Sequence, residues 1–304
     1  MIQYLYLGRV GYDDALRLQA EIAELRLAGR VENVLLLLEH PPVLTLGRNA
    51  NRSNILATDE LLARRGVTLH EINRGGDVTY HGPGQLVGYP IFDLRSLKRS
   101  GSGVPNDRSS SLVQSGNRLG PVDFVRMMEE ALIRLCGVYG VRAGRIAGLT
   151  GVWCSADGGV LGESGSTATS PRKIAAIGIH VSRGITSHGF AFNVTTDLRD
   201  FQLINPCGIT DKPVTSLELE VARDPERSTA LPSLEAIAHQ AARQFGLVFG
   251  QQVLAVESLE ALRAYAAVTQ SVPQVPQAPA QDTPLQVPRE VERLLHIPER
   301  PTRA

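Results

Sequence analysis

The sequence predicts an α/β domain, and three observations lead to that fold class. Residues 12–29 and 233–245 repeat apolar side chains at the spacing of an amphipathic helix. Residues 34–38 are consecutive apolar residues, and this short run fits a buried strand better than a membrane span. Apolar residues make up 43% of the 304-residue chain, which is enough to build a sizeable core in one large domain.

Helices are predicted where helical periodicity meets a start or stop signal. Thr58 is a favourable N-cap for a short helix, and Pro121 is a favoured first-turn residue of another. Gly29 and Gly66 are the expected stops of the helices that precede them. The predicted helices cover residues 12–29, 59–65, 122–136, 233–245 and 257–267.

Strands are predicted from short runs that are rich in apolar residues. They cover residues 33–39, 67–73, 86–92, 149–154, 173–182 and 187–195. The last two strands are separated by Arg183-Gly184-Ile185-Thr186 and are expected to form a hairpin. The stretches 40–48 and 74–85, which contain Gly and Pro, are predicted as loops.

Three segments are predicted to lie outside the packed core. Residues 98–120 and 155–171 are rich in Ser and Gly and are expected to be flexible insertions. Residues 271–304 contain seven Pro among Gln, Val and Ala, and they cannot bury enough apolar surface to offset the entropy of ordering. We therefore expect one domain over residues 1–270 and a disordered tail over residues 271–304.

The overall composition argues against several classes of protein. The formal net charge is zero, so no global basic field indicates a nucleic-acid partner. The first residues lack the basic and apolar regions of an export signal, and no apolar run could span a membrane, so a cytoplasmic location is expected. Three Cys without Cys-x-x-Cys spacing argue against a disulfide framework or a zinc site, and no metal is expected.

Lysine usage draws attention to one residue. Of the 31 basic residues only three are Lys, namely Lys98, Lys173 and Lys212. Arg keeps its proton in proteins, whereas the pKa of a Lys ammonium can be tuned until the group gives up its proton. Lys98 and Lys212 fall in polar loops, but Lys173 opens the apolar run 173–181. That position suggests chemistry at the mouth of a strand, and the alternative is an accident of composition.

Cys207 is the best candidate for a nucleophile among the three cysteines. It stands in a loop between Pro206 and Gly208, whereas Cys136 and Cys154 lie in apolar segments and are expected to be core residues. For Cys207 to be largely thiolate near neutral pH, its pKa must fall from about 8.5 towards 7, which requires about 2 kcal/mol of stabilisation. One close ammonium in a partly dry pocket could supply this, and Lys173 is the candidate.

Residues 74–85 form the densest cluster of small and polar residues. Gly75 and Gly76 would let the backbone approach a ligand closely and offer N–H groups to an anion or a carbonyl. The stretch lacks the spacing of the known nucleotide-binding loops. A tight connection between two strands would need the same glycines, and a single His81 is more often structural than catalytic, so both interpretations stay open.

Several motifs, in one order, resemble those of the lipoyl(octanoyl) transferases. The longest is residues 74–89, and the others are residues 39–48, 173–178, 188–193, 205–209 and 214–217. The resemblance covers about residues 4–250. The resemblance implies a biotin/lipoate protein ligase-like α/β fold with a mixed sheet flanked by helices. The two predicted insertions and the tail depart from the family's pattern.

The resemblance also implies an activity and a site. Members of the family move an octanoyl group from acyl carrier protein to a lysine of lipoyl domains, in E2 subunits of 2-oxoacid dehydrogenases and in the glycine cleavage H protein. The family's nucleophile corresponds to Cys207, and its pKa-lowering lysine corresponds to Lys173. Its substrate contacts correspond to Arg74, Gly75, Gly76, Asp77, Val78, Thr79, Tyr80, His81, Ala176, Ile177, Gly178, Gly189, Phe190 and Ala191.

The expected mechanism is a two-step acyl transfer, and it predicts what the site contains. An apolar tunnel for the acyl chain is expected near Gly75, Tyr80, Ile177 and Phe190. Because conversion of a thioester to an amide is downhill, no nucleotide or other cofactor is expected. No membrane or nucleic-acid partner is expected either.

Three alternatives are kept open. A lipoate-protein ligase would activate its acid with ATP and would need no Cys nucleophile, so Cys207 together with Lys173 favours the transferase. An octanoyl amidotransferase would move the acyl group between lipoyl-carrying proteins. The alternative outside enzymes is an acyl-binding regulatory module, because ligase-like folds sometimes carry DNA-binding domains, but no helix-turn-helix segment precedes residue 30.

Overall fold

The computed structural model describes residues 1–97, 119–155, 171–205, 213–224 and 230–271. The chain divides into one unit over Met1–Thr269 and a second over Gln270–Ala304. Apart from their boundary residues, the predicted insertions and the predicted tail lie outside the described residues. Within the described ranges, no helix combines the length and the apolar character that a bilayer crossing needs.

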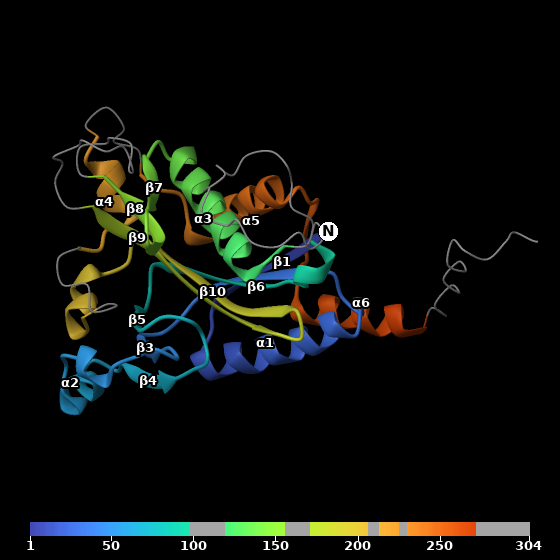
Figure 1. The fold of residues 1–304 in the computed structure, drawn as a ribbon, viewed down its shortest axis with the longest axis horizontal. Coiled ribbons are helices and arrows are strands. Elements are labelled where there is room, and N and C mark those ends of the chain that lie inside the picture. Colours follow the sequence, from blue (N-terminus) through green and yellow to red (C-terminus); the bar gives the residue numbers. More distant parts are fainter. Residues whose placement is uncertain (98–118, 156–170, 206–212, 225–229, 272–304) are drawn as a thin grey trace, which may run out of the picture. The chain divides into compact units, whose positions relative to one another are not determined.

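A large mixed sheet runs through the first unit (Figure 1). Its strands are β1 (Ile2–Arg9), β2 (Asn33–Glu39), β6 (Gln85–Ile91), β7 (Ala143–Ile146), β8 (Leu149–Cys154), β9 (Arg172–Ser182), β10 (Ile185–Asn193) and β11 (Val253–Ala255). Their order across the sheet is β11-β1-β2-β6-β10-β9-β8-β7. β1 runs parallel to β2 and β11, and the other neighbouring pairs are antiparallel.

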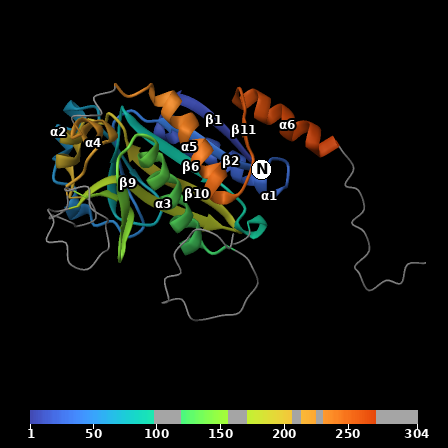
Figure 2. The ribbon, with the colours of Figure 1, turned by 90° about the horizontal axis from the view of Figure 1, so that it is seen from above.

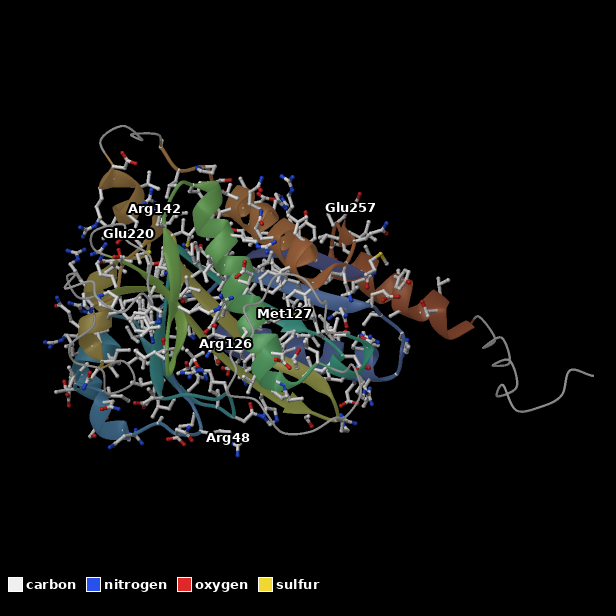
Figure 3. All side chains as sticks on the ribbon, turned by 45° about the horizontal axis from the view of Figure 1, so that its top comes forward. Arg48, Arg126, Met127, Arg142, Glu220 and Glu257 are labelled. Carbon is white, nitrogen blue, oxygen red and sulfur yellow. The ribbon has the colours of Figure 1, made fainter. Side chains whose placement is uncertain are left out.

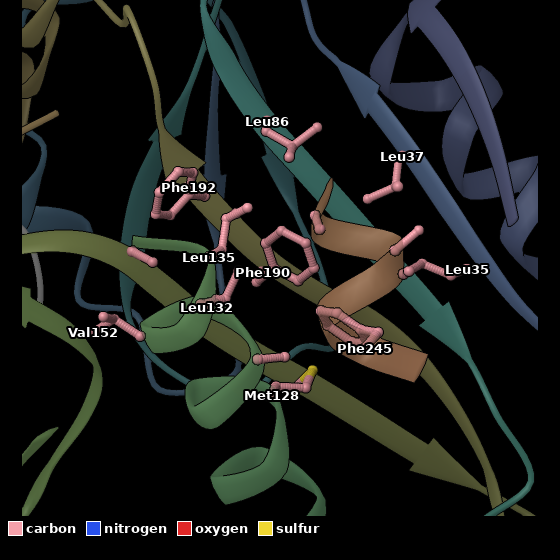
Figure 4. Close-up of a cluster of buried hydrophobic side chains, with 14 of the residues drawn as sticks. Leu35, Leu37, Leu86, Met128, Leu132, Leu135, Val152, Phe190, Phe192 and Phe245 are labelled. Atoms are coloured by element: carbon pink, nitrogen blue, oxygen red, sulfur yellow. The ribbon is translucent and has the colours of Figure 1, made fainter. Parts of the chain in front are cut away.

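Helices cover both faces of this sheet (Figures 1 and 2). One face carries α3 (Pro121–Val138) and α5 (Leu234–Phe249), and the other carries α1 (Tyr12–Leu27) and α6 (Leu259–Ser271). The burial of β2 shows why helices are needed on both faces of the sheet. Its residues 34–38 are all buried, with Leu35 and Leu37 in the core under α3 and α5 (Figure 4) and the others in the core under α1. A strand covered on both faces has an unbroken apolar sequence.

A second, smaller sheet has three strands. It contains β3 (Val43–Leu46), β4 (Thr68–Glu71) and β5 (Val78–His81) in the order β4-β3-β5. Two short helices, α2 (Asp59–Arg64) and α4 (Leu217–Ala222), complete the α-helices of the described chain, with 3-10 turns at Arg52–Asn54, Leu94–Ser96 and Leu198–Leu203. A third apolar cluster joins this sheet to α2 and to the last of these turns.

Several sequence predictions are confirmed by the structure. The predicted strand 33–39 coincides with β2. The Thr58 side chain accepts a hydrogen bond from the Leu61 N–H at the start of α2. Gly29 and Gly66 adopt positive φ after their helices, and Pro121 is the first residue of α3. The mixed α/β class is therefore confirmed. The residues predicted to start or stop these helices are also confirmed.

Other predictions are corrected. The stretches 40–48 and 74–85 are not only loops, because they contain the four-residue strands β3 and β5. The connection in the β9–β10 hairpin is only Arg183-Gly184, with φ values of 52° and 83°. Two residues with positive φ are typical of a tight hairpin turn whose twist matches its strands, so Ile185 and Thr186 belong to β10. β1, β7, β11 and α4 were not predicted, and three of these are short.

Gly88 is a position in the large sheet where an added side chain would clash with a neighbour. A Cβ on Gly88 would lie 2.2 Å from the ring of Phe190, which is buried on the neighbouring strand. We expect Gly88→Ala to lower the free energy of unfolding by roughly 1–3 kcal/mol through overpacking. Gly137→Ala is the matched control, because its Cβ would meet nothing and alanine favours helix α3 by about 0.5–1 kcal/mol. Urea unfolding of both variants checks this, and equal effects would contradict it.

Candidate active site

A cavity of about 540 Å³ lies where β5, β6, β9 and β10 meet. Lys173 lines it, as do most of the residues predicted to contact a substrate. These are Arg74, Gly75, Gly76, Asp77, Val78, Thr79, His81, Ala176, Ile177, Gly178, Gly189, Phe190 and Ala191. Residues more than a hundred positions apart in the sequence therefore share one cavity.

Tyr80 is the one predicted substrate contact that does not line the cavity. Its side chain is buried, its hydroxyl donates to the Asp200 carboxylate at 2.6 Å, and its ring packs against Phe201. Side chains alternate along a strand, so Tyr80 points away from Thr79 and His81 on β5. Tyr80 is therefore not among the residues that line the cavity, and it does not contribute to the expected apolar tunnel.

Glycines let the loop before β5 approach the middle of β9. The Gly75 N–H donates to the Ile179 carbonyl oxygen at 3.0 Å. A Cβ on Gly178 would lie 2.6 Å from the Gly75 carbonyl oxygen, so no larger residue fits there without moving the loop. Gly76 adopts a φ of +93°, which glycine tolerates best. The Gly-rich motif therefore shapes the cavity wall by close backbone contact.

The same loop is tied to the stretch after β3. The Arg48 N–H donates to the Arg74 carbonyl oxygen at 2.9 Å, and the Gly47 N–H donates to the Asp77 carbonyl oxygen at 3.2 Å. The Asp77 carboxylate accepts a hydrogen bond from the Asn51 N–H at 3.0 Å. Two motifs that the sequence separates by some thirty residues thus form a single hydrogen-bonded wall.

A directed chain of hydrogen bonds begins at Arg74. Its Nη2 donates to Thr45 Oγ1 at 2.9 Å, and Thr45 Oγ1 lies 3.4 Å from His81 Nε2. Because this hydroxyl oxygen accepts from Arg74, its proton can point to the imidazole. His81 Nδ1 lies 2.8 Å from Gln85 Oε1. An amide oxygen only accepts, so His81 carries its proton on Nδ1.

The chain continues through two amide side chains. Gln85 Nε2 donates to Asn193 Oδ1 at 2.9 Å and to the Tyr80 carbonyl oxygen at 3.1 Å. Asn193 Nδ2 donates to the Thr215 carbonyl oxygen at 2.9 Å. Every link therefore has one direction, from the guanidinium of Arg74 to a backbone carbonyl next to the Lys173 strand.

Three histidines around the cavity are kept neutral by burial. Burial lowers the pKa of His81 to about 3, with smaller effects of His40 and Arg74. Burial also lowers the pKa of His40 to about 4, and His40 sits between the Val10 carbonyl oxygen and the Tyr89 hydroxyl at 2.7 Å each. The pKa of His188 falls to about 4, again mainly through burial.

A β-bulge sets the direction of Lys173. Val152 of β8 pairs with Ala175 and Trp153 pairs with Lys173, so β9 has one extra residue, Ile174, between the two pairs. Ile174 and Ala175 consequently both join the core under α3. Alternation resumes on the other side of the bulge, and Lys173 lies on the face of Trp153. Lys173 Nζ is 4.6 Å from the centroid of the Trp153 ring.

The backbone of Lys173 is held by the segment that precedes α4. Its N–H donates to the Pro213 carbonyl oxygen, and its carbonyl oxygen accepts from the Thr215 N–H, at 2.9 Å each. The neighbouring Arg172 forms a two-pronged ion pair with Glu220 of α4, at 2.9 Å for both N–O pairs. Glu220 is labelled in Figure 3. Burial alone would raise the pKa of Glu220, but hydrogen bonds from Arg172 and Thr215 lower it.

The cysteines divide as the sequence predicts, as far as the structure describes them. Cys136 and Cys154 are buried core residues, which confirms their prediction. Burial and the nearby Glu220 raise the pKa of Cys154 to about 12, and burial raises the pKa of Cys136 well above its ordinary value. Neither thiol is suited to act as a nucleophile at neutral pH. Cys207, Lys98 and Lys212 lie outside the described residues.

Sequence reasoning did not identify several residues of the site. Gln85 and Asn193 lie within motifs that carried the resemblance, but an amide side chain in a motif does not reveal its partner. The hydroxyl of Thr45 links Arg74 to His81 from a stretch predicted as a loop. The pairing of Trp153 with Lys173 depends on the bulge, and the local sequence has no signal for it.

The free energy of unfolding should decrease as the pH is lowered, because the buried histidines resist protonation in the folded chain. The pKa of His188 is about 4 in the folded chain and about 6.5 when unfolded, so only the unfolded chain takes up its proton between these values. Stability is fully present above about pH 6.5 and is lost as the pH falls towards 4. Between pH 7 and pH 4.5, His188→Asn should lose roughly 2 kcal/mol less unfolding free energy than the unmodified chain. Urea unfolding at both pH values measures this, and equal losses would rule it out.

The chain is similar to known proteins in sequence and in fold. The chain matches the family described as the lipoyl protein ligase A/B catalytic domain over residues 11–237. It is 58% identical over 258 residues to an octanoyltransferase of Acidobacterium capsulatum, covering 85% of this chain and 94% of that protein. It is 49% identical over 260 residues to an octanoyltransferase of Koribacter versatilis, covering 85% of this chain and 88% of that protein.

Solved structures agree on the fold. A lipoate-protein ligase A bound with ATP superposes with a TM-score of 0.56 at 15% identity, covering 89% of this chain and 95% of that one. A bi-partite lipoate protein ligase from Thermoplasma acidophilum gives a TM-score of 0.56 at 15% identity, covering 89% and 93%. The expected ligase-like α/β fold is confirmed. The chain belongs to the lipoyl protein ligase A/B catalytic domain family.

Proposed function

We propose that this chain transfers an octanoyl group from a carrier thioester to a lysine amine, through a thioester on Cys207. The observation that carries the proposal is the shared cavity of Lys173, the Gly-rich loop and an apolar wall. The octanoyltransferases to which the chain is 58% and 49% identical support the identity of the acyl group. Octanoyl-acyl carrier protein is the proposed donor, and lipoyl domains are the proposed acceptors.

Chain connectivity supports the pairing of Cys207 with Lys173. Phe201 and Val214 lie on either side of the segment that carries Cys207, and both line the cavity. Pro213, at the end of that segment, is hydrogen-bonded to the backbone of Lys173. An ammonium close to a thiol stabilises the thiolate and lowers its pKa.

The first step would form the acyl-enzyme. The Cys207 thiolate attacks the thioester carbonyl, the bond from this carbon to the carrier sulfur breaks, and the carrier leaves as a thiol that takes a proton from Lys173. The Ile177 N–H is suited to hold the oxyanion. The β8–β9 ladder ends at Ala175, and the Ile179 carbonyl on the same edge already faces the Gly75 loop, so the N–H two residues earlier points to this open edge.

The second step would form the amide. The neutral amine of the acceptor lysine attacks the acyl-enzyme, its excess proton passes to Lys173 or water, and the Cys207 thiolate leaves. Neutral His81, His40 and His188 contribute polarity without adding positive charge beside Lys173. No nucleotide is needed because the thioester already activates the acyl group.

The apolar wall would select a medium-length chain. Ile177, Phe190 and Ala191 line the cavity together with Val87. Burying about six methylenes at roughly 0.8 kcal/mol each gives on the order of 5 kcal/mol, which is enough to discriminate against short acyl groups.

The main alternative is an ATP-dependent ligase, since a lipoate-protein ligase bound with ATP has the same fold. A ligase would modify a lipoyl domain from octanoate and ATP. Our proposal expects modification only from octanoyl-acyl carrier protein. Mass spectrometry of a lipoyl domain incubated with each donor separates the two, and a product from octanoate and ATP would overturn the proposal.

Cys207→Ser should abolish the covalent adduct. After incubation with octanoyl-acyl carrier protein and no acceptor, the unmodified chain should gain one octanoyl group by intact mass. Cys136→Ala is the matched control and should keep the adduct, because Cys136 is a buried core thiol with a raised pKa. An adduct that persists on Cys207→Ser would show that another residue is the nucleophile.

Lys173→Arg should separate the two steps. A guanidinium keeps the positive charge that favours the thiolate, and the carrier sulfur can leave as a thiolate that takes its proton from water, so the adduct should still form. It does not give up its proton, so transfer to the lipoyl domain should fall by about 10²–10⁴-fold. Single-turnover rates of adduct formation and decay check this, and an equal loss in both steps would contradict the role of Lys173 in proton transfer.

A further inference from the structure

Trp153 is the one tryptophan of the chain, and it lies against Lys173. Its ring is 1% exposed, and its centroid is 4.6 Å from Lys173 Nζ. The two residues are direct partners across the β8–β9 ladder, so their side chains leave the sheet on the same face. On its other side Trp153 pairs with Gly144, which has no side chain to compete for space beside the indole.

The indole contacts Lys173 through the face of its ring and not through its N–H group. The buried Trp153 Nε1 has no hydrogen-bond partner among the described residues. A cation within about 6 Å of the centroid of an aromatic ring is attracted by the ring's quadrupole, most strongly for tryptophan. The contact with Lys173 Nζ is well inside that range.

A neutral ring differs from a carboxylate as a partner for an ammonium. A carboxylate would hold the ammonium, but its negative charge would oppose the field of the ammonium at a nearby thiol. The ring attracts the ammonium while leaving its net charge intact. The Trp153 ring can therefore help to fix the position of Lys173 without itself opposing the positive charge of the ammonium.

We propose that Trp153 is a positioning residue for the transfer reaction, holding the Lys173 ammonium at the cavity through the face of its ring. The inference rests on the proposed role of Lys173. It concerns how that side chain is held, so part of its test is independent of catalysis.

The independent part uses the chain's unusual composition. With only three Lys, a chain labelled with ¹³C-lysine gives three Cε–Hε signals, and Lys98→Arg and Lys212→Arg assign them by elimination. An ammonium stem held over an indole face should resonate upfield of the other two. Trp153→Leu should remove the upfield displacement, and Trp153→Phe should keep part of it.

Trp153→Phe is the informative conservative variant because the indole N–H has no described partner to lose. Val152→Ala is the matched control for general destabilisation. Val152 precedes Trp153 on β8 but faces the core under α3, so its truncation should leave the Lys173 signal displaced. A Lys173 signal that coincides with the other two, or that is unchanged in Trp153→Leu, would overturn the proposal.

The second part asks whether the contact matters for the thiol. The alkylation rate of Cys207 by iodoacetamide at pH 7 should fall about 3- to 30-fold in Trp153→Leu and less in Trp153→Phe, as expected for losing a cation–π contact. In the Lys173→Met background, Trp153→Leu should have no further effect. A purely structural tryptophan would lower the rate by the same factor in both backgrounds, which would contradict the proposal.

The two parts separate this inference from the proposed function. If Cys207 forms no octanoyl adduct but the Lys173 signal responds to Trp153, the proposed function fails while the contact stands. If the adduct forms normally and the Lys173 signal ignores Trp153, the positioning role fails while the proposed function stands.

Discussion

The position of Lys173 depends on the extra residue in β9. Regular alternation would put Lys173 on the same face as Ala175, in the apolar core under α3 and α5. An ammonium there would have to be desolvated among aliphatic side chains, at a cost of several kcal/mol. The bulge at Ile174 resolves this conflict. One strand can then supply core residues along most of its length and a cation at its mouth.

The remaining walls of the cavity are placed by contacts between backbones. The Gly-rich loop touches β9 through the N–H of Gly75 and the missing side chain of Gly178, and it touches the segment after β3 through paired N–H and carbonyl groups. Charged side chains then fix the edges. Arg172 and Glu220 join β9 to α4, so the strand with Lys173 is tied to the segment at Pro213–Thr215 by backbone hydrogen bonds and to α4 by an ion pair. The motifs at residues 39–48, 74–89 and 173–178 each supply backbone contacts of this kind.

The sequence predicted those elements whose signals lie within one short segment of the chain. β2 was predicted because its apolar run is continuous, and α2 because Thr58 and Gly66 mark its ends. β3 and β5 have four residues each beside Gly and Pro, and they become strands only by pairing with each other. Within the site, the uneven use of lysine pointed to Lys173. The bulge and the partner Trp153 depend on register between strands, which no short window of sequence contains.

The hydrogen-bond chain from Arg74 through His81 to Asn193 also limits where protons can travel. A Grotthuss-type wire must be able to turn over, each group passing its proton on and then reversing its orientation. Here the first donor is a guanidinium that keeps its proton, and the last link is an amide nitrogen on a backbone carbonyl. Because neither end can reverse its role, this chain of polar groups is not suited to relay protons. In the proposed mechanism, proton transfer would therefore involve Lys173 and solvent.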